Sequence, residues 1–164
     1  MTFLFNPLRG SQVQMNREMR SEIEGLYGSF LTRSIRRPHS VDARKPIMIA
    51  CPDWPVPKKQ KKSISEIITN GGLHHHGILM VAPADRHHRL KVPVDQHFAD
   101  QQAYYTRDQV LKSVEAIPFL ARDSDKVTDY VLKGLKTGRT DDEETLLILP
   151  STYRTKRPYI RPDD

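Results

Sequence analysis

The sequence predicts an α+β domain, a central antiparallel sheet of about five strands with helices packed on one face of it. Short apolar runs and two stretches of helical periodicity are interspersed along the 164 residues. An Asn-Gly pair stands between two of the apolar runs, which is typical of a tight turn between antiparallel strands. The length fits one domain over residues 1–150, and the proline- and arginine-rich residues 151–164 are expected to form a flexible basic tail.

The first half of the chain contributes two strands and a helix to this prediction. Thr2 to Phe5 is a short β-prone run that ends at Asn6-Pro7. Apolar residues at three- and four-residue spacing predict a helix from Asn16 to about Ile35. Pro46 to Cys51 is interpreted as a buried strand, and the prolines around Asp53 to Pro57 favour a loop or an edge.

The second half supplies the remaining strands and a second helix. Two strands flank the Asn70-Gly71 turn, and residues 84–105 are expected to be mostly loop with a short helix. Ser124 is a plausible N-cap for a helix that ends near Thr137, with Gly138 at C′. The predicted strands are Ser63 to Ile68, Leu73 to Val81, Val114 to Phe119 and Thr145 to Leu149.

Positive charge is concentrated in clusters. The formal net charge is +6 and the isoelectric point is about 9.5. The clusters comprise Arg33 to Arg37, Lys58 to Lys62, and Arg86 to Lys91. Such clusters favour encounter with a polyanion such as nucleic acid, although a merely solvated surface is the alternative. The candidate DNA contacts are Lys58, Lys59, Lys61, Lys62, Arg86, Arg89, Lys126 and Lys136.

Several classes of protein are disfavoured. The single cysteine, Cys51, forms no internal disulfide and builds no cysteine-type zinc site, and a reducing cytoplasm is the expected compartment. No stretch approaches the roughly 20 apolar residues of a membrane span. Residues 1–8 lack the features of a signal peptide.

Three consecutive histidines stand on the strand after the turn. Side chains alternate along a strand, so His74 and His76 share one face and can converge on one divalent ion, whereas His75 points the other way. The alternative is a pair of structural histidines in the core or on the surface.

The third ligand depends on the register of the hairpin. Glu66 faces the site if it pairs with His76, but a slip of one residue turns it away. Asp53 and Glu115 are the other candidates.

The second predicted helix carries a tyrosine beside lysines. Tyr130 and Lys133 are neighbours on a helix surface, and Lys126 lies one turn earlier. An ammonium next to a phenol favours the nucleophilic phenolate and can meet charge that develops on a phosphate. Alternatively, Tyr130 is a half-buried residue at the edge of the core. The apolar stripe that would dock this helix consists of Val127, Val131 and Leu135.

The order of these motifs resembles that of the HUH endonucleases, which include rolling-circle replication initiators and related transposases. Residues 2–7 resemble the first motif of that superfamily, His74 to His76 the His-hydrophobic-His motif, and Val127 to Lys133 the helix with Tyr-x-x-Lys. The middle residue of the second motif is histidine instead of an apolar residue, and the helicase domain of many viral relatives is missing.

The resemblance implies a single-tyrosine enzyme that nicks and rejoins single-stranded DNA. Tyr130 would attack the phosphate to leave a 5′-phosphotyrosine link, with Lys133 positioning it. Mg²⁺ or Mn²⁺ would be bound by His74, His76 and an oxygen ligand, for which Glu66 is the first candidate. The implied partners are single-stranded DNA or a DNA hairpin at an origin, and a helicase of the host.

Three other interpretations remain open at this point. The chain is a basic nucleic-acid-binding module without catalysis, a decayed or accessory copy of the enzyme, or a metal-binding regulatory protein. The last of these would use His74 to His76 together with His87 and His88.

Overall fold

A computed structural model describes residues 1–40, 43–53, 69–136 and 146–151. Its strands form one sheet in the order β4-β1-β3-β2-β5, and every neighbouring pair is antiparallel. The α+β layout with an antiparallel sheet is therefore confirmed. The strands are β1 (Thr2–Phe5), β2 (Ile47–Asp53), β3 (His74–Met80), β4 (Leu111–Glu115) and β5 (Leu147–Leu149).

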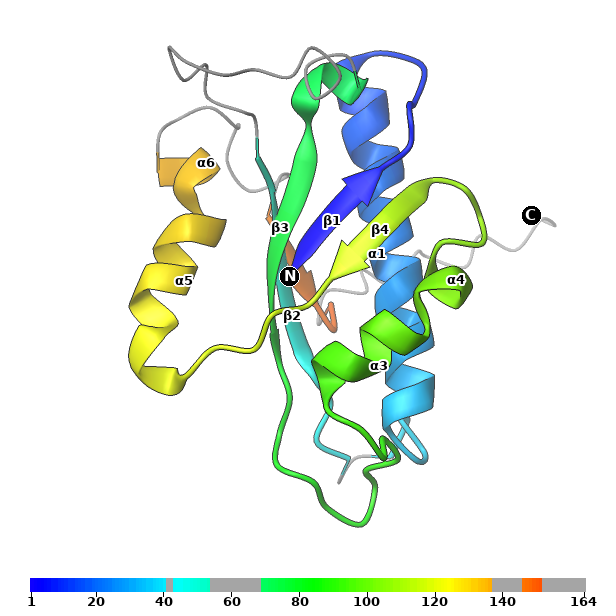
Figure 1. Ribbon diagram of the computed structural model, residues 1–164, viewed down its shortest axis with the longest axis vertical. Coiled ribbons are helices and arrows are strands. Elements are labelled where there is room, and N and C mark those ends of the chain that lie inside the picture. Colours follow the sequence, from blue (N-terminus) through cyan, green and yellow to red (C-terminus); the bar gives the residue numbers. More distant parts are fainter. Residues whose placement is uncertain (41–42, 54–68, 137–145, 152–164) are drawn as a thin grey trace, which may run out of the picture.

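Helices lie on both faces of this sheet, so the prediction that they cover only one face is wrong. The long α1, together with α3 and α4, covers one face, and α5 and α6 lie on the other (Figure 1). Among the described helices, none has the length and apolar composition that crossing a bilayer requires. The helices are α1 (Gln12–Ser34), α3 (Val94–Asp100), α4 (Gln102–Tyr105), α5 (Ser124–Val131) and α6 (Lys133–Lys136), and the 3₁₀ segments are η1 (Thr69–Gly72) and η2 (Ala121–Asp123).

Side chains alternate between the two faces of the sheet along each strand, and each face contributes to a separate hydrophobic core, one larger than the other. The larger core joins the α1 face of the sheet to α1 and α3, and it includes Phe3, Phe30 and Phe98. The smaller core joins Cys51 and Ile78 to Val131 of α5. Because the faces alternate along β3, residues 74 and 76 belong to the α5 side of the sheet.

Two helical regions differ from the sequence-based prediction. The first helix begins at Gln12 instead of Asn16, because Ser11 and Gln14 form a capping box that the apolar periodicity does not reveal. Residues 84–105, expected to be mostly loop, contain α3 and α4, which bury Phe98 and Tyr105. Helices this short present too few apolar positions to show a clear period.

Two element boundaries also differ. The strand predicted over Val114 to Phe119 runs from Leu111 to Glu115, and the chain leaves the ladder before Pro118, which lacks a backbone donor. The second predicted helix starts at Ser124 with Asp123 as its cap residue, and it is interrupted at Leu132 between α5 and α6. The predicted helix end at residues 137–138 lies outside the described residues, as do residues 152–164 of the predicted tail.

The Asn-Gly pair adopts the predicted backbone conformation, and it lies in the 3₁₀ segment η1, which precedes β3. Asn70 and Gly71 have φ angles of 55° and 62°. The side chain of Asn70 accepts a hydrogen bond from the Leu8 amide at 2.7 Å and donates one to the Asn6 carbonyl at 3.0 Å, so the turn is tied to the end of β1. The strand predicted over residues 63–68 lies outside the described residues, and the strands that flank β3 are β1 and β2.

Candidate metal site and its tyrosine

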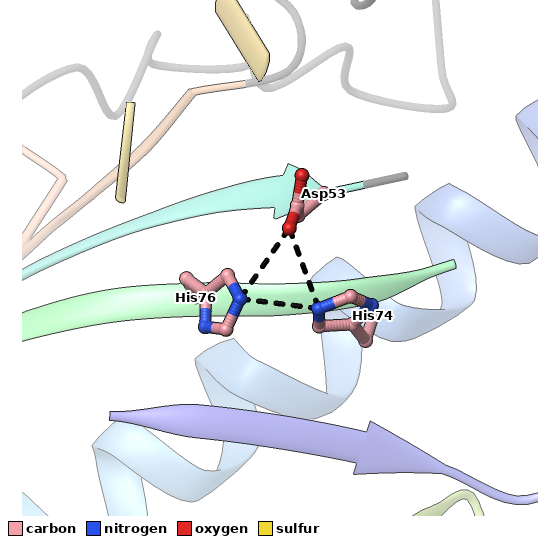
Figure 2. Close-up of side chains that lie close together, drawn as sticks. All are labelled: Asp53, His74 and His76. Carbon is pink, nitrogen blue, oxygen red and sulfur yellow. Dashed lines mark hydrogen bonds and ion pairs between the residues drawn. The ribbon is translucent and has the colours of Figure 1, made fainter. Parts of the chain in front are cut away.

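The register of the sheet brings one carboxylate and two imidazoles together. Asp53 is the ladder partner of His74, and His76 pairs with Cys51 on one side and with Thr2 on the other. Ladder partners point to the same face of a sheet, so Asp53, His74 and His76 gather on the α5 side. Figure 2 shows the three side chains converging from the last residue of β2 and the start of β3.

The ligand atoms of this cluster form a nearly equilateral triangle. The two Nε2 atoms are 3.1 Å apart, and Asp53 Oδ2 lies 3.5 Å from Nε2 of His74 and 3.4 Å from Nε2 of His76. Atoms with these separations can all lie about 2.1 Å from one ion, the usual length of a bond from a metal to nitrogen or oxygen. Within the part of the chain that the structure describes, this is the one group of its kind close enough to hold a metal ion.

The hydrogen bonds of the imidazoles favour metal binding. Nδ1 of His74 donates to the Gly72 carbonyl at 2.9 Å, which leaves the lone pair of Nε2 directed at the cluster. Nδ1 of His76 lies 3.4 Å from the hydroxyl of Thr2. Burial lowers the pKa of His74 despite the Gly72 carbonyl, so this ring is neutral at neutral pH. A neutral imidazole is the form that binds a metal.

Asp53 is the charged member of the cluster. It is only 2% exposed, and its Oδ1 atom has no hydrogen-bond partner among the residues that the structure describes. Burial opposes ionisation, but contacts with His76 and Lys133 outweigh it and hold the pKa of Asp53 below its usual value. A buried carboxylate with an unsatisfied oxygen beside two imidazole lone pairs fits a bound cation.

Tyr130 and Lys133 border this cluster. The ring of Tyr130 lies 4.7 Å from the ring of His76, centroid to centroid, and the residue is 54% exposed. Nζ of Lys133 lies 2.7 Å from Asp53 Oδ2 and 4.4 Å above the centroid of the Tyr130 ring. The sequence-based prediction that Tyr130 and Lys133 are neighbours is therefore confirmed, although the helix breaks between them. A pocket of about 230 Å³ is lined by both Tyr130 and His76.

The structure places the other metal-ligand candidates differently. Glu66 lies outside the described residues, and the two ladder positions beside His76, one of which Glu66 was expected to fill, are occupied by Thr2 and Cys51. Glu115 lies on β4, with β1 between it and β3. Asp53 takes the third position. Burial raises the pKa of the Cys51 thiol to about 11, which keeps this neighbour protonated.

The candidate DNA-binding residues are distributed over the molecule. Lys126 of α5 contacts Asp123, and Lys136 of α6 contacts Asp129 of α5. Arg86 and Arg89 lie in the segment that follows the last residue of β3, whereas His74 is its first residue. Arg89 donates to the Thr32 carbonyl in the last turn of α1, and Arg86 donates to His87. The four lysines between 58 and 62 lie outside the described residues.

The sequence pattern could have placed Asp53 beside the histidines, but the strand was predicted to end at Cys51, two residues too early. Residues 49, 51 and 53 alternate on one face of β2, so a strand extended by two residues places a carboxylate beside the histidines. The three prolines between 52 and 57 argued against that extension. Pro52 is nevertheless tolerated because β5 pairs only with residues 48–50, and one edge of β2 needs no ladder bond with β5 there.

Comparison with known proteins adds no relative: the chain matches no protein-family model, no curated protein and no solved structure.

Proposed function

We propose that this chain is a single-tyrosine nicking-joining endonuclease of the HUH type that acts on single-stranded DNA. The observation that carries the proposal is the contact between the ring of Tyr130 and the ring of His76, a member of the cluster of Asp53, His74 and His76. The order of the motifs along the chain and the antiparallel sheet that carries the histidines support it.

The donor set can hold one divalent cation, and the proposed nicking chemistry makes Mn²⁺ or Mg²⁺ the cation that we propose. Two imidazole nitrogens and one carboxylate oxygen, all from one side of the ion, leave room for oxygen ligands from a phosphate or from water. When bound, the ion would polarise the scissile phosphate and neutralise part of its charge.

The residues of the chain would perform the remaining chemistry. The phenolic oxygen of Tyr130, having lost its proton to solvent, attacks phosphorus in line with the departing 3′ oxygen. The P–O3′ bond breaks, the 3′ oxygen takes up a proton, and a 5′-phosphotyrosine link remains. The reverse attack of that hydroxyl rejoins the strand. Lys133, which contacts both Asp53 and the Tyr130 ring, is placed to neutralise the phosphate in the transition state.

The test is the formation of a covalent protein-DNA adduct. We expect the purified chain, mixed with circular single-stranded DNA and Mn²⁺, to give an adduct that survives denaturing electrophoresis. EDTA should abolish the adduct, and added Mn²⁺ should restore it.

Two tyrosine variants separate catalysis from binding. Tyr130→Phe should lose the adduct and keep DNA binding, because only the nucleophilic oxygen is removed. Tyr104→Phe is the matched control, since Tyr104 packs between Arg33 and Arg107, away from the cluster. If Tyr130→Phe forms the adduct at the normal rate, the assignment of the nucleophile is wrong. Binding without any adduct would favour a nucleic-acid-binding module or a decayed copy.

A further inference from the structure

The pocket beside Tyr130 has a polar floor that the proposed chemistry does not use. Thr2 of β1 is the ladder partner of both Glu115 on β4 and His76 on β3. The three side chains therefore stand in one row on the α5 face of the sheet, and all three line the pocket. In this row Thr2 lies between His76, a member of the metal cluster, and Glu115.

The walls of the same pocket are apolar and aromatic. They include Ile117 and Phe119, from the segment that follows β4, and Tyr130 from α5. Ile117 is 69% exposed and Phe119 is 41% exposed, so these side chains present apolar surface to solvent at the mouth of the pocket. Rings and apolar side chains around a polar floor suit a flat ligand with a polar edge.

A nucleobase is the ligand that matches both features. Bases stack on aromatic side chains in proteins that bind single strands, and their edges form hydrogen bonds with polar groups. A phosphate at Tyr130 would bring the base of an adjoining nucleotide to this pocket. Met1 also lines the pocket, and its N-terminal ammonium donates to the Gly77 carbonyl at 2.6 Å and interacts with Glu115, so the pocket offers both a donor and an acceptor to the edge of a base.

The chemistry of Glu115 narrows the choice of base. An ionised carboxylate only accepts hydrogen bonds, and an exocyclic amino group donates them. Uracil and thymine present a carbonyl oxygen where cytosine presents an amino group. A carboxylate would repel that oxygen.

We infer that the pocket between β4 and α5 holds the base next to the scissile phosphate, and that Glu115 selects a base with an exocyclic amino group. This inference rests on the proposed function, because the phosphate at Tyr130 determines which base can reach the pocket. It gives the nicking reaction a sequence preference at one position.

Short single-stranded oligonucleotides test the inference without requiring cleavage. Binding of fluorescent pentanucleotides is measured by anisotropy in the presence of Mn²⁺, with two pairs of probes. Oligo-deoxycytidine is compared with oligo-deoxyuridine, and oligo-deoxyadenosine with the corresponding purine oligomer that lacks the amino group. The amino-bearing member of at least one pair should bind on the order of ten-fold more tightly.

Three variants assign that difference to the pocket. Glu115→Gln should reduce the discrimination to about two-fold, because the amide both donates and accepts. Phe119→Ala should weaken binding of all probes by about ten-fold through lost stacking. Leu120→Ala is the matched control, since Leu120 is the next residue, is exposed and does not line the pocket.

The outcomes separate this inference from the proposed function. If neither pair is discriminated, if no pentanucleotide binds, or if Phe119→Ala behaves like Leu120→Ala, the base pocket is wrong, even where the Tyr130 adduct forms. If the discrimination depends on Glu115 but no adduct ever forms, the pocket stands as a base-binding site and the nicking activity is wrong.

Discussion

His75 places an imidazole where a sheet facing a core usually carries an apolar side chain. It is fully buried, and its ring lies 5.6 Å from that of Phe5. Within the described part of the chain, neither of its ring nitrogens has a hydrogen-bond partner. The middle histidine of the triplet therefore lies on the core side of β3, as the alternation predicts, and it is not part of the metal cluster. Its orientation also argues against a regulatory site that uses all three histidines.

Replacing His75 with leucine should stabilise the protein. The change removes a buried donor without a partner, so the free energy of unfolding should rise by about 1–3 kcal/mol at neutral pH, as measured by urea denaturation. His97→Leu is the matched control, because His97 is bonded to the Tyr105 hydroxyl at 2.9 Å and its loss leaves that hydroxyl unsatisfied. That variant should be destabilised. A loss of stability in His75→Leu similar to that in His97→Leu would contradict this description of the site.

The stability of the wild type should also fall on acidification. Burial lowers the pKa of His75 to about 3, from 6.5 for an unperturbed histidine, so the native ring stays neutral while the unfolded chain binds a proton. Between pH 6.5 and 3 the unfolded state holds more protons, and this residue alone should lower the free energy of unfolding by up to about 1.4 kcal/mol per pH unit. Denaturation curves between pH 7 and 4 should therefore have a smaller pH slope in His75→Leu. Equal slopes would show that the ring is not buried in its neutral form.

At the scale of elements, pairing between distant strands creates the cluster, and local sequence does not encode that pairing. The Asn-Gly turn and the positions of β1, β2, β3 and β5 were predicted because each depends on residues close in sequence. The sequence predicted residues 63–68 as the neighbour of β3 across the Asn-Gly turn, whereas β1 and β2 flank β3 in the structure. The turn residues are a local signal and favoured the hairpin, whereas the pairing of β3 with residues 47–53 depends on long-range contacts. For this reason His74 and His76 could be chosen from their spacing, whereas the carboxylate remained open among Glu66, Asp53 and Glu115.

A bound metal ion should stabilise the folded protein by linking the paired strands β2 and β3. The ligands lie on adjacent strands, so an ion that binds the folded cluster stabilises the fold, by about 2.7 kcal/mol when its concentration is a hundred-fold above its dissociation constant. Thermal unfolding should therefore shift upward with Mn²⁺ in the wild type. The shift should be much smaller in Asp53→Asn and unchanged in Asp100→Asn, an exposed carboxylate on α3. Equal shifts in all three proteins would place the bound ion elsewhere.

On the scale of the whole molecule, the candidate site and one positive cluster lie at opposite ends of β3. His74 begins the strand, and Arg86 follows its other end (Figure 1). The seven residues of the strand alone span roughly 20 Å. A dinucleotide at Tyr130 is too short to contact both places, whereas a much longer strand can. The excess of positive charge was evident from the sequence, but this separation depends on the fold.

The length of the DNA should therefore determine which basic residues contribute to its binding. Arg86→Gln should leave the affinity for a dinucleotide unchanged and weaken binding of a much longer single strand. In the longer complex, the plot of log affinity against log salt concentration should become shallower by about 0.7, the value for one lost phosphate contact. Lys126→Gln, on the same helix as Tyr130, should weaken both complexes. Arg89 is less suitable for this test because it also bonds the last turn of α1. If Arg86→Gln weakens binding of the dinucleotide as much as binding of the long strand, DNA does not follow the sheet from Tyr130 toward the end of β3.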